Sequence, residues 1–183
     1  VIDFIAWHKL YCQKRDLYCD IHFFMEQGKS VYHNTVFPEY KCNRSLSDMF
    51  GLDLEDMNYF KNVMDQNYNI LEYTINKIPN CYFYRLKYCE ADFIPWYLME
   101  YLIPKENQEE SINLIYTRDK DMLQCLKFPN TYQFYRANYK ETTSIITPKS
   151  LLRHWAKLDE NVVIDRVADW FPLFLSMFGD NAD

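Results

Sequence analysis

The segment Asn113–Leu126 constrains the fold of this chain more than any other stretch. It begins with a short apolar, β-prone run that is typical of a buried strand in a parallel sheet, and it ends with apolar residues at helical spacing. Asp119 and Asp121 therefore lie where a strand ends and a helix begins. In open α/β sheets ligands bind at this edge, beyond the carboxyl ends of the strands. Carboxylates there either cap the helix or hold a cation, and both interpretations of Asp119 stay open.

Strand-like and helix-like segments alternate along the rest of the chain. Further strands are expected at residues 20–25, 81–86, 131–136 and 144–146. Helices are expected at residues 2–17, 53–78, 90–103 and 165–178, the last with a break at Pro172, and Thr147-Pro148 opens another helix. The charged segment 104–110 is typical of a surface loop. This alternation predicts one α/β domain over residues 1–183, with a mainly parallel sheet covered by helices on both faces.

Composition excludes several classes of protein. The chain has only three glycines, so Gly-rich phosphate loops are excluded. No apolar run approaches the roughly 20 residues of a membrane helix, so we expect no membrane partner. The six cysteines lack C-x-x-C spacing, which indicates reduced thiols, a cytoplasmic protein and no structural zinc. Most of these cysteines are expected in the core, with Cys42 as the exception.

Acidic residues cluster after the predicted strands and near the end of the chain. In a parallel sheet the clusters that follow strands would converge on one edge, and together they need a compensating positive charge. Oxygen-only ligands favour Mg²⁺ or Mn²⁺ over zinc, and two such ions are a standard arrangement for cutting phosphodiesters. The net charge of −6 argues against nucleic acid as a partner unless these acids belong to a metal site. The predicted metal ligands are Glu26, Glu90, Asp92, Asp119, Asp121, Asp180 and Asp183.

A basic and aromatic patch is expected near residue 40. Lys41 and Arg44 have i, i+3 spacing and would share one face of a helix, with Tyr40 beside them. Such a face suits the backbone and a stacked base of single-stranded nucleic acid, although an ordinary solvated loop is the alternative.

Four segments, in this order, resemble the 5′ nuclease family, which includes bacteriophage 5′→3′ exonucleases of the T-even RNase H type, flap endonucleases and the 5′-nuclease domain of DNA polymerase I. The resemblance covers about residues 20–183. The segments are Phe37-Pro-Glu-Tyr-Lys-Cys-Asn-Arg44, Cys89-Glu-Ala-Asp92, Arg118-Asp-Lys-Asp-Met-Leu-Gln124 and Gly179-Asp-Asn-Ala-Asp183.

The resemblance implies a PIN-like three-layer fold with a helical arch at about residues 36–70, incomplete here at both ends. It implies a monomeric nuclease that uses two Mg²⁺ or Mn²⁺ ions to cut 5′ flaps, nicked or branched DNA, or RNA/DNA hybrids in replication or repair. Asp119, Asp121, Glu90 and Asp92 would be catalytic. Tyr40, Lys41 and Arg44 would belong to the arch, and Lys29 would also contact nucleic acid. If the source is viral, the location would be the host cytoplasm.

Two positions depart from the family pattern. Phe93 stands where the family usually has a further Asp, and Glu26 stands where it usually has Asp after the second strand. The longer side chain of Glu26 matters because Mg²⁺ demands strict geometry. These departures motivate a second hypothesis, a catalytically degenerate relative that binds branched DNA without cutting it. A PIN-type ribonuclease is a third, and the arch-like segment argues against it.

Overall fold

The computed structural model describes residues 1–28, 31–36, 38, 51, 53–135, 144–151 and 167–178. Within these ranges the chain is a mixed α/β protein, as the sequence predicts, and it divides into two compact units, Val1–Ile94 and Pro95–Asp183. The single domain expected from the sequence stays a prediction. None of the helices in the described ranges is long and apolar enough to cross a membrane.

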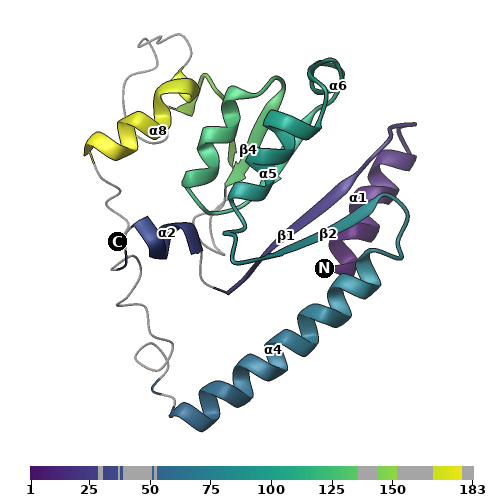
Figure 1. Cartoon of the computed structure of the whole chain (residues 1–183). Helices are drawn as coiled ribbons and strands as arrows, with labels where there is room; N and C mark the ends of the chain where they lie inside the picture. Colours follow the sequence, from purple (N-terminus) through teal and green to yellow (C-terminus); the bar gives the residue numbers. More distant parts are fainter. Residues whose placement is uncertain are drawn as a thin grey trace. The chain divides into compact units, whose positions relative to one another are not determined.

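The first unit is built on a pair of parallel strands, β1 (Ile21–Gln27) and β2 (Cys81–Lys87), which run in register from Ile21 opposite Cys81 to Gln27 opposite Lys87. Figure 1 shows the two strands side by side. Along the sequence the long helix α4 comes after β1 and before β2. The helices of this unit are α1 (Ile2–Gln13), α2 (Val31–Val36) and α4 (Leu54–Ile75). Alternate strand residues pack with α1 and α4 in one core, which consists of Ile5, Ile21, Ile75, Cys81 and Phe83 with flanking apolar side chains.

Local chemistry explains where the helices of the first unit begin and end. Asp53 caps α4, because its carboxylate accepts a hydrogen bond of 2.9 Å from the amide of Asp56. The helix α1 ends in a Schellman motif, in which Asp16 has φ +55° and the amide of Leu17 donates to the carbonyl of Cys12 at 3.0 Å. This left-handed residue reverses the chain and leads it towards β1.

Arg85 joins the parallel strands to α4. Its guanidinium donates to Oδ1 of Asn69 at 2.9 Å, forms an ion pair with Asp65 and lies 5.2 Å from the ring centre of Tyr68. A charged side chain on a buried strand position needs such partners, since an unpaired buried charge is costly. The three contacts therefore fix α4 against β2.

The second unit is built around the seven-residue 3₁₀-helix η2 (Asp121–Lys127). It also contains the π-helix η1 (Leu98–Leu102) and the helices α6 (Lys105–Glu110) and α8 (Val167–Phe178). The short helix α5 (Phe93–Tyr97) crosses the boundary between the units. Three residues per turn give η2 two apolar faces. One face packs with α8 in the cluster Leu123, Leu126, Ile146, Leu151, Ala168 and Phe171, and the other belongs to the cluster Met99, Met122, Cys125 and Phe128.

The sheet of the second unit has the order β3 (Asn113–Tyr116), β4 (Thr131–Tyr135), β5 (Ser144–Ile146). The strands β3 and β4 are parallel, while β4 and β5 are antiparallel. The five strands of the described ranges thus form two small sheets, and the expectation of one central sheet is wrong for them. The backbone hydrogen bonds of β2 go to β1, whereas those of β3 go to β4.

Two smaller expectations are also wrong. The charged segment predicted as a loop contains α6, because the buried amide of Gln108 donates to the carbonyls of Met99 at 2.6 Å and Ile103 at 2.8 Å and thereby ties this segment to η1. Pro172 does not break the last helix, which continues through it.

Candidate functional site

The parallel pairing of β1 and β2 brings three of the sequence-predicted ligands to one edge of the first sheet. Glu26 is the penultimate residue of β1 and is opposite Leu86 in the register, while Glu90 and Asp92 follow the end of β2. The two strand ends are bonded to each other, since the amide of Tyr88 donates to the carbonyl of Gln27 at 2.8 Å. This is the carboxyl edge at which ligands bind in α/β proteins.

The three carboxylates differ in their exposure. Glu26 is exposed, Asp92 is half-buried, and Glu90 is only 8% exposed. Burial and the negative charges of Asp92 and Glu90 raise the pKa of the Cys89 thiol. Both carboxylates therefore contribute to a negative potential at one place beyond β2.

Tyr88 gives this edge its backbone geometry. It has φ +64°, a conformation that bulky residues rarely adopt, and it lies directly before Cys89 and Glu90. Its ring lies against Gly28, where an added Cβ would be 3.4 Å from Cδ1 of Tyr88. Gly28, with φ +83°, is visible in the sequence as a turn residue, but nothing in the sequence indicates the left-handed conformation of Tyr88. Strained residues of this kind often occur at functional sites.

Asp119 and Asp121 lie in the second unit, directly beyond β3. The hydroxyl of Thr117 accepts a hydrogen bond of 3.1 Å from the amide of Asp119, and Oδ1 of Asp119 accepts one of 3.0 Å from the amide of Asp121. Asp119 thus closes an Asx turn that leads into η2. It is not the helix cap considered in the sequence, because the N-cap of η2 is Lys120 and its side chain makes no capping hydrogen bond. Both aspartates are exposed. The hydrogen bond from the Asp121 amide occupies Oδ1 of Asp119, and the carboxylate has a second oxygen besides.

Gln133 stabilises this turn from β4, and no pattern in the sequence singles it out. It lies on β4 opposite Ile115, is 0% exposed, and donates from Nε2 to the carbonyls of Asp119 at 3.0 Å and Thr117 at 3.4 Å. Thr131, two residues earlier, is buried as well. The inward positions of β4 are therefore polar, and a period-two pattern cannot distinguish such a strand from one facing the other way.

The remaining predicted residues cannot be assigned a place. Lys29, Tyr40, Lys41, Arg44, Asp180 and Asp183 lie outside the described residues, as does Cys42. The described acids belong to the two units separately, with Glu26, Glu90 and Asp92 in the first and Asp119 and Asp121 in the second. Among the residues that the structure describes, no three histidines, cysteines or acids are grouped so that they could hold a metal ion.

Phe93, the departure from the family pattern that follows Asp92, is the first residue of α5 and is 43% exposed. An aromatic side chain at this position supplies no oxygen to a cation. Comparison of the chain with protein-family models, curated proteins and solved structures found no match. The resemblance to 5′ nucleases therefore depends on the sequence segments quoted above.

Proposed function

We propose that the chain is a divalent-metal-dependent 5′ nuclease that hydrolyses phosphodiester bonds of DNA flaps or RNA primers. The observation that carries the proposal is the parallel register of β1 and β2, which gathers Glu26, Glu90 and Asp92 at one carboxyl edge. Asp119 and Asp121 have the equivalent position after β3 in the second unit.

The donor chemistry fits Mg²⁺ or Mn²⁺. Carboxylate oxygens are the ligands that these ions prefer, and the buried Glu90 is a suitable anionic partner. The proposed ligands are Glu26, Glu90 and Asp92 in the first unit and Asp119 and Asp121 in the second. Asp180 and Asp183 stay predicted ligands that lie outside the described residues. Bound divalent ions would supply a water of lowered pKa and stabilise the negative charge on the phosphate.

The chain's own side chains would have distinct tasks in this reaction. Glu90 follows Tyr88, whose left-handed backbone turns the chain at the end of β2. Asp121 is held by the Asx turn of Asp119, which Gln133 supports through its two hydrogen bonds. Preorganised ligands of this kind lower the cost of binding. Lys29, Tyr40, Lys41 and Arg44 would position the nucleic acid and would not touch the metal.

A second candidate is a DNA-binding relative that does not cut. It is favoured by Phe93, because this side chain removes an acid next to Asp92, and by the absence of a grouped set of three ligands among the described residues. In this case branched DNA would bind with a strong salt dependence, but no metal would support cleavage.

One assay tests both candidates. The chain is incubated with a 5′-labelled flap substrate in Mg²⁺ or Mn²⁺, beside Glu90→Gln, Asp121→Asn and a control, Glu106→Gln, which removes an exposed carboxylate from α6. The nuclease proposal predicts cleavage by the parent and the control and at least a hundredfold loss (on the order of the contribution of one positioned catalytic group) in the two site variants. Binding without product in either metal would identify the second candidate. Equal rates in all four proteins would contradict the assigned site.

A further inference from the structure

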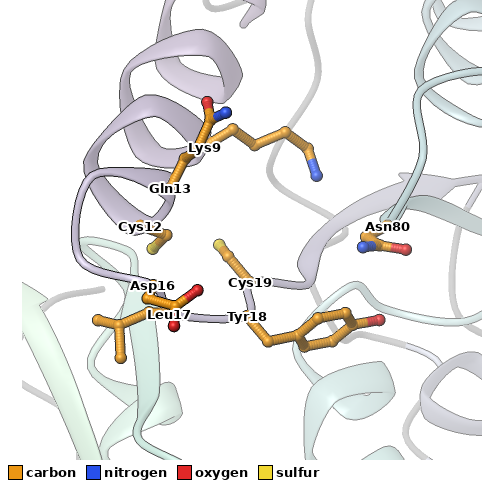
Figure 2. A pocket seen from close by; sticks show the side chains of 8 residues that line it. All are labelled: Lys9, Cys12, Gln13, Asp16, Leu17, Tyr18, Cys19 and Asn80. Atoms are coloured by element: carbon orange, nitrogen blue, oxygen red, sulfur yellow. The ribbon is translucent and has the colours of Figure 1, made fainter.

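A groove in the first unit carries two thiols that the proposed function does not use. It has a volume of about 510 Å³ and lies where α1 ends and β1 begins. Figure 2 shows the sulfur atoms of Cys12 and Cys19 turned into the same space, with the Lys9 side chain on the neighbouring turn of α1. The other lining residues are Gln13, Asp16, Leu17, Tyr18 and Asn80.

The Schellman motif at the end of α1 creates this arrangement. Cys12 supplies the carbonyl that accepts the amide of Leu17, and Asp16, in the left-handed conformation, reverses the chain. The reversed chain then carries Cys19 back to the last turn of the helix, seven positions after Cys12. Both side chains are half-buried, so a small reagent can reach them from the groove.

The two thiols are chemically unequal. Burial and a hydrogen bond with Cys12 raise the pKa of the Cys19 thiol to about 11. Cys19 therefore stays protonated near neutral pH, and its thiol donates to the carbonyl of Asp20 at 4.0 Å. The ammonium of Lys9 acts on Cys19 in the opposite direction, because a positive charge favours a thiolate. Because Cys19 keeps its proton, we assign Cys12 as the thiol that attacks first and Cys19 as the thiol that resolves.

We propose that Cys12 and Cys19 form a dithiol modification site that is oxidised to an internal disulfide by small disulfides of the glutathione class. The Cys12 thiolate attacks one sulfur of the reagent, so a mixed disulfide forms and one thiolate leaves. The Cys19 thiol then loses its proton, its sulfur attacks Cys12, and the second thiolate leaves. The protein loses two electrons and two protons, and the reagent becomes two thiols.

The test is peptide mapping of the reduced chain after exposure to oxidised glutathione and alkylation of the remaining thiols. The parent is compared with Cys12→Ser, Cys19→Ser and a matched control, Cys89→Ser, which removes a half-buried thiol of the same unit. We expect a Cys12–Cys19 disulfide in the parent and in the control. Cys19→Ser should stop at a mixed disulfide on Cys12, and Cys12→Ser should leave Cys19 alkylated.

A second measurement keeps the test independent of the folding of the serine variants. Phenylarsine oxide, which needs two neighbouring thiols, should protect Cys12 and Cys19 of the native parent from alkylation together, and leave Cys89 reactive. The proposal is overturned if Cys12 and Cys19 of the oxidised parent are alkylated as fully as in the reduced protein. It is equally overturned if a mixed disulfide on Cys12 persists without an internal bond.

Discussion

Gln133→Glu is the substitution whose effect follows most directly from the structure. Nε2 of Gln133 donates to two carbonyl oxygens from a fully buried position. A glutamate side chain has the same shape but carries an oxygen in place of Nε2. That oxygen would face the two carbonyl oxygens. If it ionised, a buried charge without a donor would cost several kcal/mol. The side chain therefore keeps its proton in the folded protein and donates one hydrogen bond, so its folded pKa lies above the value of the unfolded chain.

The size of the effect depends on pH. Holding a proton on a carboxyl group with an unfolded pKa of about 4.3 costs about 1.4 kcal/mol for each pH unit above that value, or about 3–4 kcal/mol at pH 7. The lost second hydrogen bond adds roughly 0.5–1.5 kcal/mol at every pH. The pKa of the new carboxyl group is higher in the folded than in the unfolded protein. The stability of the variant is therefore closest to that of the parent at a pH below the unfolded-state pKa, and it falls as the pH rises.

Urea unfolding of the variant and the parent between pH 4 and pH 7 measures this difference. Gln66→Glu, on an exposed position of α4, is the matched control and should differ from the parent by less than about 0.5 kcal/mol throughout. A difference between Gln133→Glu and the parent that does not grow with pH would refute the assignment of Gln133 as the buried donor that supports the Asp119 turn.

Three further predictions concern other parts of the chain. His22 is exposed, but desolvation by the aromatic rings stacked beside it lowers its pKa below the ordinary value of 6.5. A small part of the stability, reduced by solvent screening, is therefore present above that value and should fall as the pH drops below it, and His22→Gln should flatten this part of the urea-unfolding profile. Oxidation of Cys12 and Cys19 should raise the free energy of unfolding by about 2 kcal/mol, because the disulfide closes a short loop and so lowers the entropy of the unfolded chain. An unchanged urea midpoint would contradict this. Lys41→Ala with Arg44→Ala should lower the salt dependence of DNA binding by roughly one unit of log–log slope per lost phosphate contact, measured by fluorescence anisotropy, and an unaltered slope would indicate an ordinary loop.

The strands were predictable because their apolar patterns are short and bounded by turns. Residues 20–25, 81–86 and 131–136 were expected as strands, and β1, β2 and β4 confirm them within two residues at each end. Their pairing was not predictable, since each strand has only a few residues and similar patterns can pair in several ways. The strands of the described residues therefore form two sheets where the sequence suggested one.

Parallel strands end at the same side of a sheet, so the sequence predicted that Glu26 and the acids after the second strand would lie at one edge, and β1 and β2 do end side by side. The convergence of all seven predicted ligands in one metal site stays a prediction. The residues that shape the edge could not be inferred. Tyr88 adopts a conformation that its side chain disfavours, and Gln133 is a polar residue on an inward position. The approach of Cys19 to Cys12 depends on the left-handed conformation of Asp16. It could not be predicted, because aspartate occurs in many kinds of turn.

The most direct test of the proposed metal site is Mn²⁺ titration followed by amide signals in a two-dimensional NMR spectrum. Mn²⁺ broadens only the signals of residues near the bound ion. We predict that substoichiometric Mn²⁺ broadens the amides next to Glu90 and Asp92, and those next to Asp119 and Asp121, before any others. Glu90→Gln and Asp121→Asn should weaken this broadening, whereas Glu106→Gln should not change it. Uniform broadening, or none at millimolar Mn²⁺, would contradict the proposal that these carboxylates bind divalent cations.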